Sequence, residues 1–252
     1  MMHAGAGYIV AHYISNMKKE NFTLVTGATA GFGEAIARQL ASEGHKIIIT
    51  GRREERLERI RQELLSGGCE DVLTLSFDVR DRQAVKEAAG EMAEKGVEIG
   101  RLVNNAGLAL GLAGIEDGDP DDWETMIDTN VKGLLFCTKY FLPLMPDGAH
   151  ILHIGSIAGK EVYPGGNVYS ATKLAVDALN RAMRIDLLER GIKVSQIAPG
   201  LAETEFSIVR FKGDNKKAAQ VYRGLTPLFA GDIAEAASFI FSRPEHVCIN
   251  DM

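Results

Sequence analysis

The chain has 252 residues, of which 46% are hydrophobic and 25% are charged, and these proportions are typical of a globular protein with a sizeable core. They exclude a disordered chain, a collagen and a small disulfide-rich scaffold, and the length favours a single domain. The formal net charge of −6 leaves no broad basic surface for nucleic-acid phosphates or anionic lipids. We therefore expect no nucleic-acid partner and no membrane partner.

Residues 1–20 are interpreted as an N-terminal extension ahead of a domain formed by residues 21–252. The extension lacks the basic start of a signal peptide, and His12 interrupts its short apolar run. No apolar run in the chain reaches the ~18–20 residues needed to cross a bilayer. Met17, which two lysines follow, is a natural alternative start. These features predict a cytoplasmic protein.

The cysteines and histidines show no pattern of a metal or disulfide site. The three cysteines are widely spaced without a CxxC motif, and the six histidines form no HxxxH pair. We therefore expect no bound metal and no disulfide framework, and we interpret these side chains as structural or surface groups.

Strand-like and helix-like segments alternate along the chain from residue 22 onward. Short β-branched or aliphatic runs occupy residues 22–26, 46–50, 72–77, 101–104, 150–155 and 192–198. Apolar residues with helical spacing occupy residues 33–43, 53–65, 81–95, 121–141, 167–190 and 232–242. This alternation predicts an α/β fold: a single doubly wound Rossmann-type domain with a parallel sheet flanked by helices on both faces.

Two segments depart from the alternation. Residues 201–230 are polar and weakly periodic, so we expect a long loop that is either a functional lid over the substrate or disordered. The chain then ends in HVCINDM, which resembles the start of a strand. A seventh strand is therefore expected to be short or unfinished.

The first predicted strand runs into the sequence TGATAGFG and then directly into a helix. Glycines at Gly27, Gly31 and Gly33 permit a tight turn that brings backbone amides close to a pyrophosphate at the helix N-terminus. A purely structural turn is the alternative. The position between a strand and a helix at the start of the domain favours dinucleotide binding.

The second predicted strand is followed, after Gly51, by Arg52 and Arg53. NAD-binding Rossmann units place a carboxylate here to hold the ribose 2′-hydroxyl, whereas two guanidiniums suit a 2′-phosphate. The alternative is that both arginines only begin a solvated helix with its own ion pairs. We therefore predict NADP(H) as the cofactor, with Arg52 favoured over Arg53 as the phosphate ligand.

The segment NVYSATK places Tyr169 and Lys173 four residues apart, so both project from one face of a helix. Thirteen residues earlier, Ser156 follows a strand at the edge of the sheet where such folds bind ligands. Asn130 lies on another predicted helix, and the sequence NNAG over residues 104–107 closes the fourth strand.

Over residues 21–252 the sequence resembles the classical short-chain dehydrogenase/reductase family. The motifs that carry this resemblance occur in the family's order: TGxxxGxG, NNAG, the helix asparagine, the serine, YxxxK and the PG after the sixth strand. Within it, TGATAGFG, TGRR, NNAGLALG and TEFSIVRFKGD are most similar to NADP-dependent 3-hydroxy acid dehydrogenases, the serine or malonic semialdehyde reductase type. The N-terminal extension and the end of the chain just after its final strand depart from the family pattern.

The resemblance implies a role for each motif residue. Tyr169 is the general acid/base, Lys173 its activator and ribose ligand, Ser156 the donor to the substrate oxygen, and Asn130 the holder of a relay water. Asp78 and Val79 are assigned to the adenine, and Asn105 with Gly107 to the adjoining ribose. The full predicted cofactor set is Gly27, Thr29, Ala30, Gly31, Phe32, Gly33, Arg52, Arg53, Asp78, Val79, Asn105, Gly107, Tyr169, Lys173, Pro199, Gly200, Leu201 and Thr204.

The chemistry explains these residue types. Hydride reduction of a carbonyl leaves an alkoxide that must take a proton, and a tyrosine with its ordinary pKa near 10 is a poor base in the reverse direction. We expect the Lys173 ammonium and an oxidised nicotinamide to lower the pKa of Tyr169. Packing roles for Tyr169 and Lys173, and a cap or kink for Asn130, are the structural alternatives.

A 3-hydroxy acid also needs a cation beside its carboxylate. Arg210 and Lys212 in the 201–230 segment are the candidates, and Arg210, with its planar fork, is the predicted substrate clamp beside Ser156 and Tyr169. A solvated lid with scattered charges is the alternative.

The sequence therefore predicts an NADP(H)-dependent oxidoreductase acting on a small 3-hydroxy acid or semialdehyde, with a small molecule as its partner. A 3-oxoacyl or general carbonyl reductase is the alternative within the family. An idle NADP(H)-binding redox sensor is the alternative outside it. A homo-oligomer, either a tetramer or a dimer, is also expected from the family resemblance.

Overall fold

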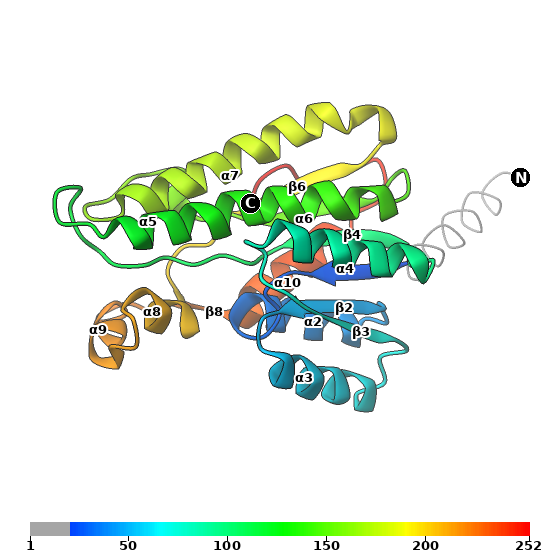
Figure 1. Ribbon diagram of the computed structural model, residues 1–252, viewed down its shortest axis with the longest axis horizontal. Coiled ribbons are helices and arrows are strands. Elements are labelled where there is room, and N and C mark those ends of the chain that lie inside the picture. Colours follow the sequence, from blue (N-terminus) through cyan, green and yellow to red (C-terminus); the bar gives the residue numbers. More distant parts are fainter. Residues whose placement is uncertain (1–20) are drawn as a thin grey trace, which may run out of the picture.

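The computed structural model describes residues 21–252, and the predicted extension lies outside these residues. Its centre is a six-stranded parallel sheet with the order β3-β2-β1-β4-β5-β6 (Figure 1). The strands are β1 Phe22–Val25, β2 Ile47–Gly51, β3 Val72–Ser76, β4 Ile99–Asn104, β5 His150–Ile154 and β6 Lys193–Ile197. Every residue of β2 and β5 is buried, as expected for a parallel sheet that is covered on both faces.

Seven longer helices accompany the sheet in the described part of the chain. They are α2 Gly31–Ser42, α3 Glu54–Ser66, α4 Arg82–Glu94, α5 Pro120–Ile127, α6 Leu134–Phe141, α7 Asn167–Asp186 and α10 Ala230–Phe241.

Alternate residues of each strand serve the two faces of the sheet. Val25 packs with α2, α3 and α10 in one apolar cluster, whereas its neighbour Leu24 packs with α4, α6 and α7 in the other. This alternation is the period of two of an extended strand. The predicted doubly wound fold with helices on both faces is confirmed.

The strand order reverses between β1 and β4, which lie side by side although two strands separate them in the sequence. Connections diverge to opposite faces at such a point and leave a crevice beyond the carboxyl ends of the strands. The segments after β1, β4 and β5 therefore meet at one edge of the sheet.

The helix predicted over residues 121–141 is interrupted. A π-helical turn over Asp128–Gly133 separates α5 from α6. Apolar spacing continues through the turn, so periodicity alone predicts one helix. Gly133 lies within the turn, and a β-carbon there would lie 2.7 Å from a methyl of Val79. Local π-helical turns of this kind are frequent at functional sites.

The predicted irregular loop over residues 201–230 is wrong as a description of the structure. It contains α8 Glu205–Arg210, α9 Asn215–Gln220 and a parallel pair of two-residue strands, β7 Ala202–Glu203 and β8 Leu228–Phe229. Side-chain caps begin both helices: Thr204 accepts from the Phe206 amide, and Asp214 accepts from two amides of α9. These local caps stabilise helices too short to show a periodic pattern.

The end of the chain lies beside β6. The Ala198 amide donates to the Met252 carbonyl at 2.7 Å, and the Met252 amide donates to the Gln196 carbonyl at 3.0 Å. A single parallel bridge between Gln196 and Asp251 results.

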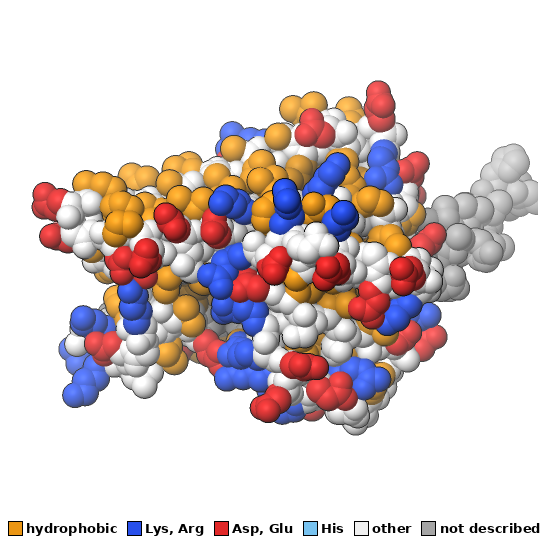
Figure 2. Space-filling view, in the orientation of Figure 1, with side chains coloured by type: hydrophobic (Ala, Val, Ile, Leu, Met, Phe, Trp, Pro, Cys, Tyr) orange, Lys and Arg blue, Asp and Glu red, His pale blue; other side chains and the backbone are white. Residues whose placement is uncertain are grey.

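The surface carries charges of both signs, while apolar side chains gather along the edge formed by α5, α6 and α7 (Figure 2). Ile127, Leu135, Leu174 and Ile185 are exposed on these helices. Among residues 21–252, no helix is both long and apolar enough to cross a membrane.

Candidate active site

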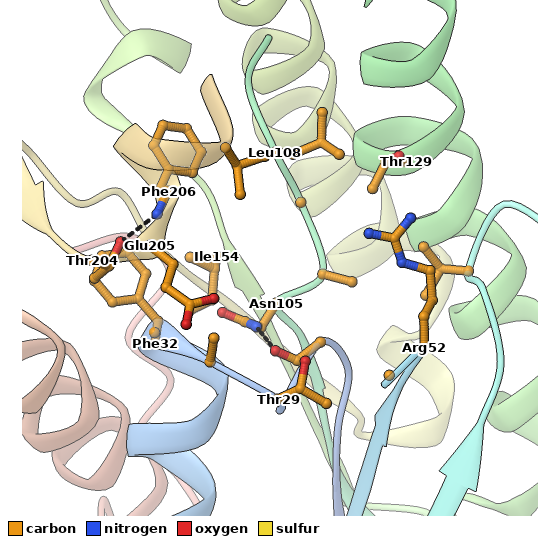
Figure 3. A pocket seen from close by; sticks show the side chains of 18 of the residues that line it. Thr29, Phe32, Arg52, Asn105, Leu108, Thr129, Ile154, Thr204, Glu205 and Phe206 are labelled. Atoms are coloured by element: carbon orange, nitrogen blue, oxygen red, sulfur yellow. Dashed lines mark hydrogen bonds between the residues drawn. The ribbon is translucent and has the colours of Figure 1, made fainter. Parts of the chain in front are cut away.

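A cavity of about 310 Å³ opens at the carboxyl edge of the sheet, at the reversal of strand order. Figure 3 shows Thr29 and Asn105 on its floor, Arg52 on one side, and Phe32, Thr204 and Glu205 on the opposite side. Its lining joins the glycine-rich turn, the ends of β2 to β5, α7 and α8. Predicted cofactor residues that line it are Gly27, Thr29, Ala30, Gly31, Phe32, Arg52, Arg53, Asp78, Val79, Asn105, Gly107, Tyr169, Lys173 and Thr204.

The glycine-rich turn has the geometry that requires glycine. Gly27 and Gly31 have φ of +65° and +56°, a region that side chains disfavour. A β-carbon on Gly33 would lie 2.4 Å from Nδ2 of Asn105 and 2.5 Å from the Gly27 carbonyl oxygen. Ala30 makes no side-chain cap to α2, so the first amides of this helix are available to an anion. The turn therefore fits a dinucleotide pyrophosphate.

Arg52 and Arg53 occupy different environments. The Arg52 side chain is 62% exposed, and its Nη1 lies 3.5 Å from an Asp78 carboxylate oxygen. Arg53 donates from Nε and Nη2 to the Thr29 hydroxyl at 3.1 and 2.8 Å and from Nη1 to Glu205 at 3.1 Å. Arg52 is thus the guanidinium with more donors to offer a 2′-phosphate, and Arg53 is held by the protein itself.

Asp78 and Val79 follow β3 on the same side of the cavity. The Asp78 carboxylate accepts from the backbone and guanidinium of Arg80. Partial burial opposes its ionisation, but these bonds and the Arg52 charge hold the pKa of Asp78 below its usual value. The carboxylate therefore fixes Arg52 and Arg80 electrostatically.

Tyr169 lies in the first turn of α7 and is buried. Burial raises its pKa to about 12, although a hydrogen bond with Ser156 and the nearby Arg210 charge act in the opposite direction. The predicted lowering by Lys173 is therefore not seen in this cavity, where the cost of burying a phenolate dominates. Tyr169 is a protonated phenol here, which suits a proton donor.

Lys173 lies one helical turn after Tyr169 and is also buried. Its Nζ donates to the Ile154 carbonyl at 2.8 Å and lies 5.9 Å from the centre of the Tyr169 ring. Burial lowers its pKa to about 8, because a charged amine loses hydration there. Ser156, just beyond β5, is extended, and its hydroxyl accepts from the Ala158 amide at 3.1 Å.

Asn130 lies in the π-helical turn between α5 and α6. Its side-chain oxygen accepts from the Leu108 amide at 2.8 Å, and its nitrogen donates to the Leu108 carbonyl at 2.8 Å and to the Thr172 hydroxyl at 3.0 Å. The amide thus joins the segment after β4 to the turn of α7 that precedes Lys173. Its role in holding a relay water stays a prediction.

Arg210 lies at the end of α8 and reaches the ring of Tyr169. Its Nε donates to the Gly111 carbonyl at 3.1 Å, and its Nη2 donates to the Tyr163 hydroxyl at 2.6 Å. The guanidinium carbon is 5.7 Å from the Tyr169 ring centre. Arg210 and Tyr169 both line a second, smaller pocket, together with Trp123.

Lys212, the other candidate clamp, points elsewhere. Its Nζ lies 2.9 Å from an Asp122 oxygen and 3.4 Å from an Asp119 oxygen. Two carboxylates at the start of α5 therefore hold it, whereas Arg210 contacts the ring of Tyr169.

Some residues fall outside the sequence prediction. Gly33, Asn130, Ser156, Pro199, Gly200 and Leu201 do not line the larger cavity, whereas Phe77, Thr129, Glu205, Phe206 and Val209 do although they were not predicted. Glu205 and Phe206 belong to the segment predicted as a loop, where the Thr204 cap was the available signal. Residues 21–252 contain no group of three or more His, Cys, Asp or Glu side chains that could hold a metal.

Comparisons with known proteins agree with this geometry. A family model described as short chain dehydrogenase matches residues 21–215. The NADP-dependent 3-hydroxy acid dehydrogenase of Salmonella typhi is 50% identical over 230 residues, which cover 90% of this chain and 91% of that protein. Sulfoacetaldehyde reductase 2 of Chromohalobacter salexigens is 45% identical over 233 residues, covering 91% of this chain and 92% of that protein.

A solved structure titled the closed form of serine dehydrogenase complexed with NADP+ has a TM-score of 0.87 and 45% identity, and the match covers 92% of this chain and 93% of that one. The crystal structure of serine dehydrogenase from Escherichia coli matches with a TM-score of 0.76 and 41% identity, covering 92% and 95%. Fold, cavity and sequence similarity agree: the chain belongs to the short-chain dehydrogenase family.

Proposed function

We propose that this protein transfers a hydride between NADP(H) and the hydroxyl or carbonyl carbon of a small 3-hydroxy acid or the matching semialdehyde. The observation that carries the proposal is the position of Tyr169, which lines both the large cavity and the smaller pocket that holds Arg210. A proton donor thus lies between a space suited to a dinucleotide and a space with a cation.

The cofactor would bind along the large cavity. The amides at the start of α2 would hold its pyrophosphate, and Arg52 would bind its 2′-phosphate because Arg53 is already engaged by Thr29 and Glu205. Lys173 would hold the nicotinamide ribose. When bound, NADP(H) supplies or accepts the hydride.

Proton transfer falls to Tyr169. In the reducing direction its phenol gives a proton to the oxygen of the reacting carbonyl, and Ser156 donates a hydrogen bond to that same oxygen as negative charge develops. In the oxidising direction the phenol must ionise, and burial of its side chain opposes this step. The cation of Lys173 and a positive nicotinamide provide the compensating charge.

Arg210 would bind the acid end of the substrate. The names of two relatives mention a 3-hydroxy acid and sulfoacetaldehyde. In both molecules a single carbon atom separates the anionic group from the reacting carbon. The guanidinium carbon of Arg210 lies 5.4 Å from the Tyr163 ring centre and 5.7 Å from the Tyr169 ring centre, so a cation lies beside the ring that carries the proton donor. A cation beside the proton donor suits a small substrate that carries an acidic group close to its reacting carbon.

The apolar edge formed by α5, α6 and α7 supports a homo-oligomer, either a dimer or a tetramer, in which these helices pack between copies. The absence of a membrane-crossing helix among residues 21–252 accords with a cytoplasmic location, which we propose for the enzyme.

A substrate panel tests the proposal. Purified protein with NADP+ is offered serine, allo-threonine, 3-hydroxypropionate and 3-hydroxyisobutyrate, and with NADPH it is offered malonic semialdehyde, while absorbance of the reduced cofactor is recorded. Turnover on several of these acids supports the proposal. Preference for uncharged carbonyls or 3-oxoacyl thioesters would favour the broader reductase, and tight NADPH binding without any turnover would favour a redox sensor.

A further inference from the structure

The first residue of α8 connects the two halves of the active site. Glu205 lines the large cavity, and Figure 3 shows its side chain directed toward the glycine-rich floor. Its carboxylate accepts from Arg53 at 3.1 Å and from Arg56 at 2.9 and 3.2 Å. Both arginines belong to the start of α3 or the residue before it, so this single carboxylate ties α8 to the helix that follows the cofactor-selecting strand.

Arg53 is fixed by these contacts. Each of its three guanidinium nitrogens already donates, two to the Thr29 hydroxyl and one to Glu205. Thr29 lies in the glycine-rich turn. A continuous chain of hydrogen bonds therefore runs from that turn through Arg53 to α8.

The far end of α8 is anchored on the substrate side. The Gly111 amide donates to the Arg210 carbonyl at 2.9 Å, and the Arg210 guanidinium contacts Tyr163. Lys212 follows with a positive φ of 51°, a strained conformation for a side chain of this type, and pairs with Asp122 at 2.9 Å. The short helix thus spans the site from the cofactor arginines to the substrate arginine.

The pairing also solves an electrostatic problem. An unpaired carboxylate on the wall of a cavity for an anionic dinucleotide would repel it, whereas Glu205 with two arginines has a net positive charge. Partial burial opposes ionisation of Glu205, but hydrogen bonds from Arg56 and Arg53 hold its pKa below the usual value. The carboxylate therefore stays charged and paired at neutral pH.

We propose that Glu205, Arg53 and Arg56 form an ionic latch that holds α8 over the active site, and that Arg53 and Arg56 are positioning residues rather than 2′-phosphate ligands. The latch sets the position of Arg210 because Glu205 and Arg210 are the first and last residues of the same short helix. It rests on the proposed function only in taking NADP(H) as the dinucleotide.

The test uses the full chain and two measurements that do not depend on turnover. Amide hydrogen exchange of residues 202–224 is followed by mass spectrometry without cofactor, and dissociation constants for NADPH and NADH are measured by nicotinamide fluorescence. The variants are Arg56→Gln, Glu205→Gln and Arg53→Gln. Arg59→Gln is the matched control, because Arg59 lies on the same helix and pairs with Glu63 at 2.9 Å.

Exposed ion pairs contribute little singly, so the latch predicts a rise of roughly 3- to 10-fold in exchange over residues 202–224 for Glu205→Gln and Arg56→Gln, with no change for Arg59→Gln. Arg56 does not line the cavity, so Arg56→Gln should weaken the binding of NADPH and of NADH by the same factor. Arg53→Gln should behave likewise.

Exchange in Arg56→Gln equal to that of the wild type would overturn the latch. If Arg53→Gln weakened the binding of NADPH but not of NADH and left amide exchange unchanged, Arg53 would be a phosphate ligand. That result would also overturn the latch. If no substrate in the panel is turned over, these exchange and binding results still decide the latch separately from the proposed function.

Discussion

Tyr169 combines burial, contact with Ser156 and a place on the wall between two pockets. Replacing it by phenylalanine removes the hydroxyl and keeps the ring. We expect Tyr169→Phe to lower kcat by roughly 10²- to 10⁴-fold, because general acid/base catalysis is lost, while NADPH binding is nearly unchanged. Steady-state rates and cofactor titration check this. A variant retaining more than about a tenth of wild-type kcat would remove Tyr169 from the mechanism.

Lys173 should cost stability as well as serve catalysis. Its pKa falls from 10.5 to about 8 on folding. Below pH 8 the native state therefore carries the full free-energy cost of burying a charged amine, roughly 3 kcal/mol. Between pH 8 and 10.5 the unfolded chain binds more protons than the native protein, so this penalty fades as the pH rises. Lys173→Met should therefore unfold at a higher denaturant concentration than wild type at pH 7, despite being inactive.

The same denaturant titration repeated between pH 7 and pH 10 provides the control for Lys173→Met. The stability advantage of the variant should shrink steadily above pH 8. An advantage that stays constant over this interval would show that packing, and not the buried charge, is responsible.

Arg52 is the residue on which cofactor choice should depend. Arg52→Asp deletes a 2′-phosphate partner and places a carboxylate near the ribose hydroxyls, so preference should move toward NAD(H). The loss for NADP(H) should be on the order of 1.5–3 kcal/mol, the range for hydrogen bonds to charged groups. The check is kcat/KM for both cofactors, and an unchanged ratio would mean that the end of β2 does not select the cofactor.

At the scale of elements, two helix glycines should respond oppositely to alanine. A β-carbon on Gly33 in α2 would lie closer to Asn105 and to the Gly27 carbonyl than van der Waals contact allows. Gly33→Ala should therefore lower the free energy of unfolding by about 1–3 kcal/mol through overpacking. Gly90 in α4 has open space where a β-carbon would lie, so Gly90→Ala should raise the free energy of unfolding by about 0.5–1 kcal/mol. Chemical denaturation measures both, and similar changes in the two variants would contradict the close packing of the turn.

The elements also show where sequence patterns succeed. Strands β2 and β5 are rich in isoleucine and leucine and are buried along their whole length, and the predicted segments match them closely. The π-helical turn around Asn130 was missed because its cause is tertiary: the Asn130 amide bonds Leu108 and Thr172, far away in the sequence. Helices α8 and α9 were missed because two turns are too short for periodicity to appear.

At the scale of the whole molecule, the topology explains the site. The connections that diverge to opposite faces between β1 and β4 bring the glycine turn, the end of β2 and the start of α7 to one edge of the sheet. Most of the predicted cofactor residues line the cavity, because each belongs to a motif near a strand end. Glu205 and Phe206 were not predicted, since only the folded position of α8 brings them to the cavity.

Comparing a charged with an uncharged substrate tests the central claim most directly. Initial rates of NADP+ reduction are measured with 3-hydroxypropionate and with 1-propanol, which has the same carbon chain without the acid, for wild type and Arg210→Ala. We predict strong preference for the acid in the wild type, and a raised KM for the acid alone in Arg210→Ala. Equal losses on both substrates, or a wild type that ignores the acid group, would contradict the account.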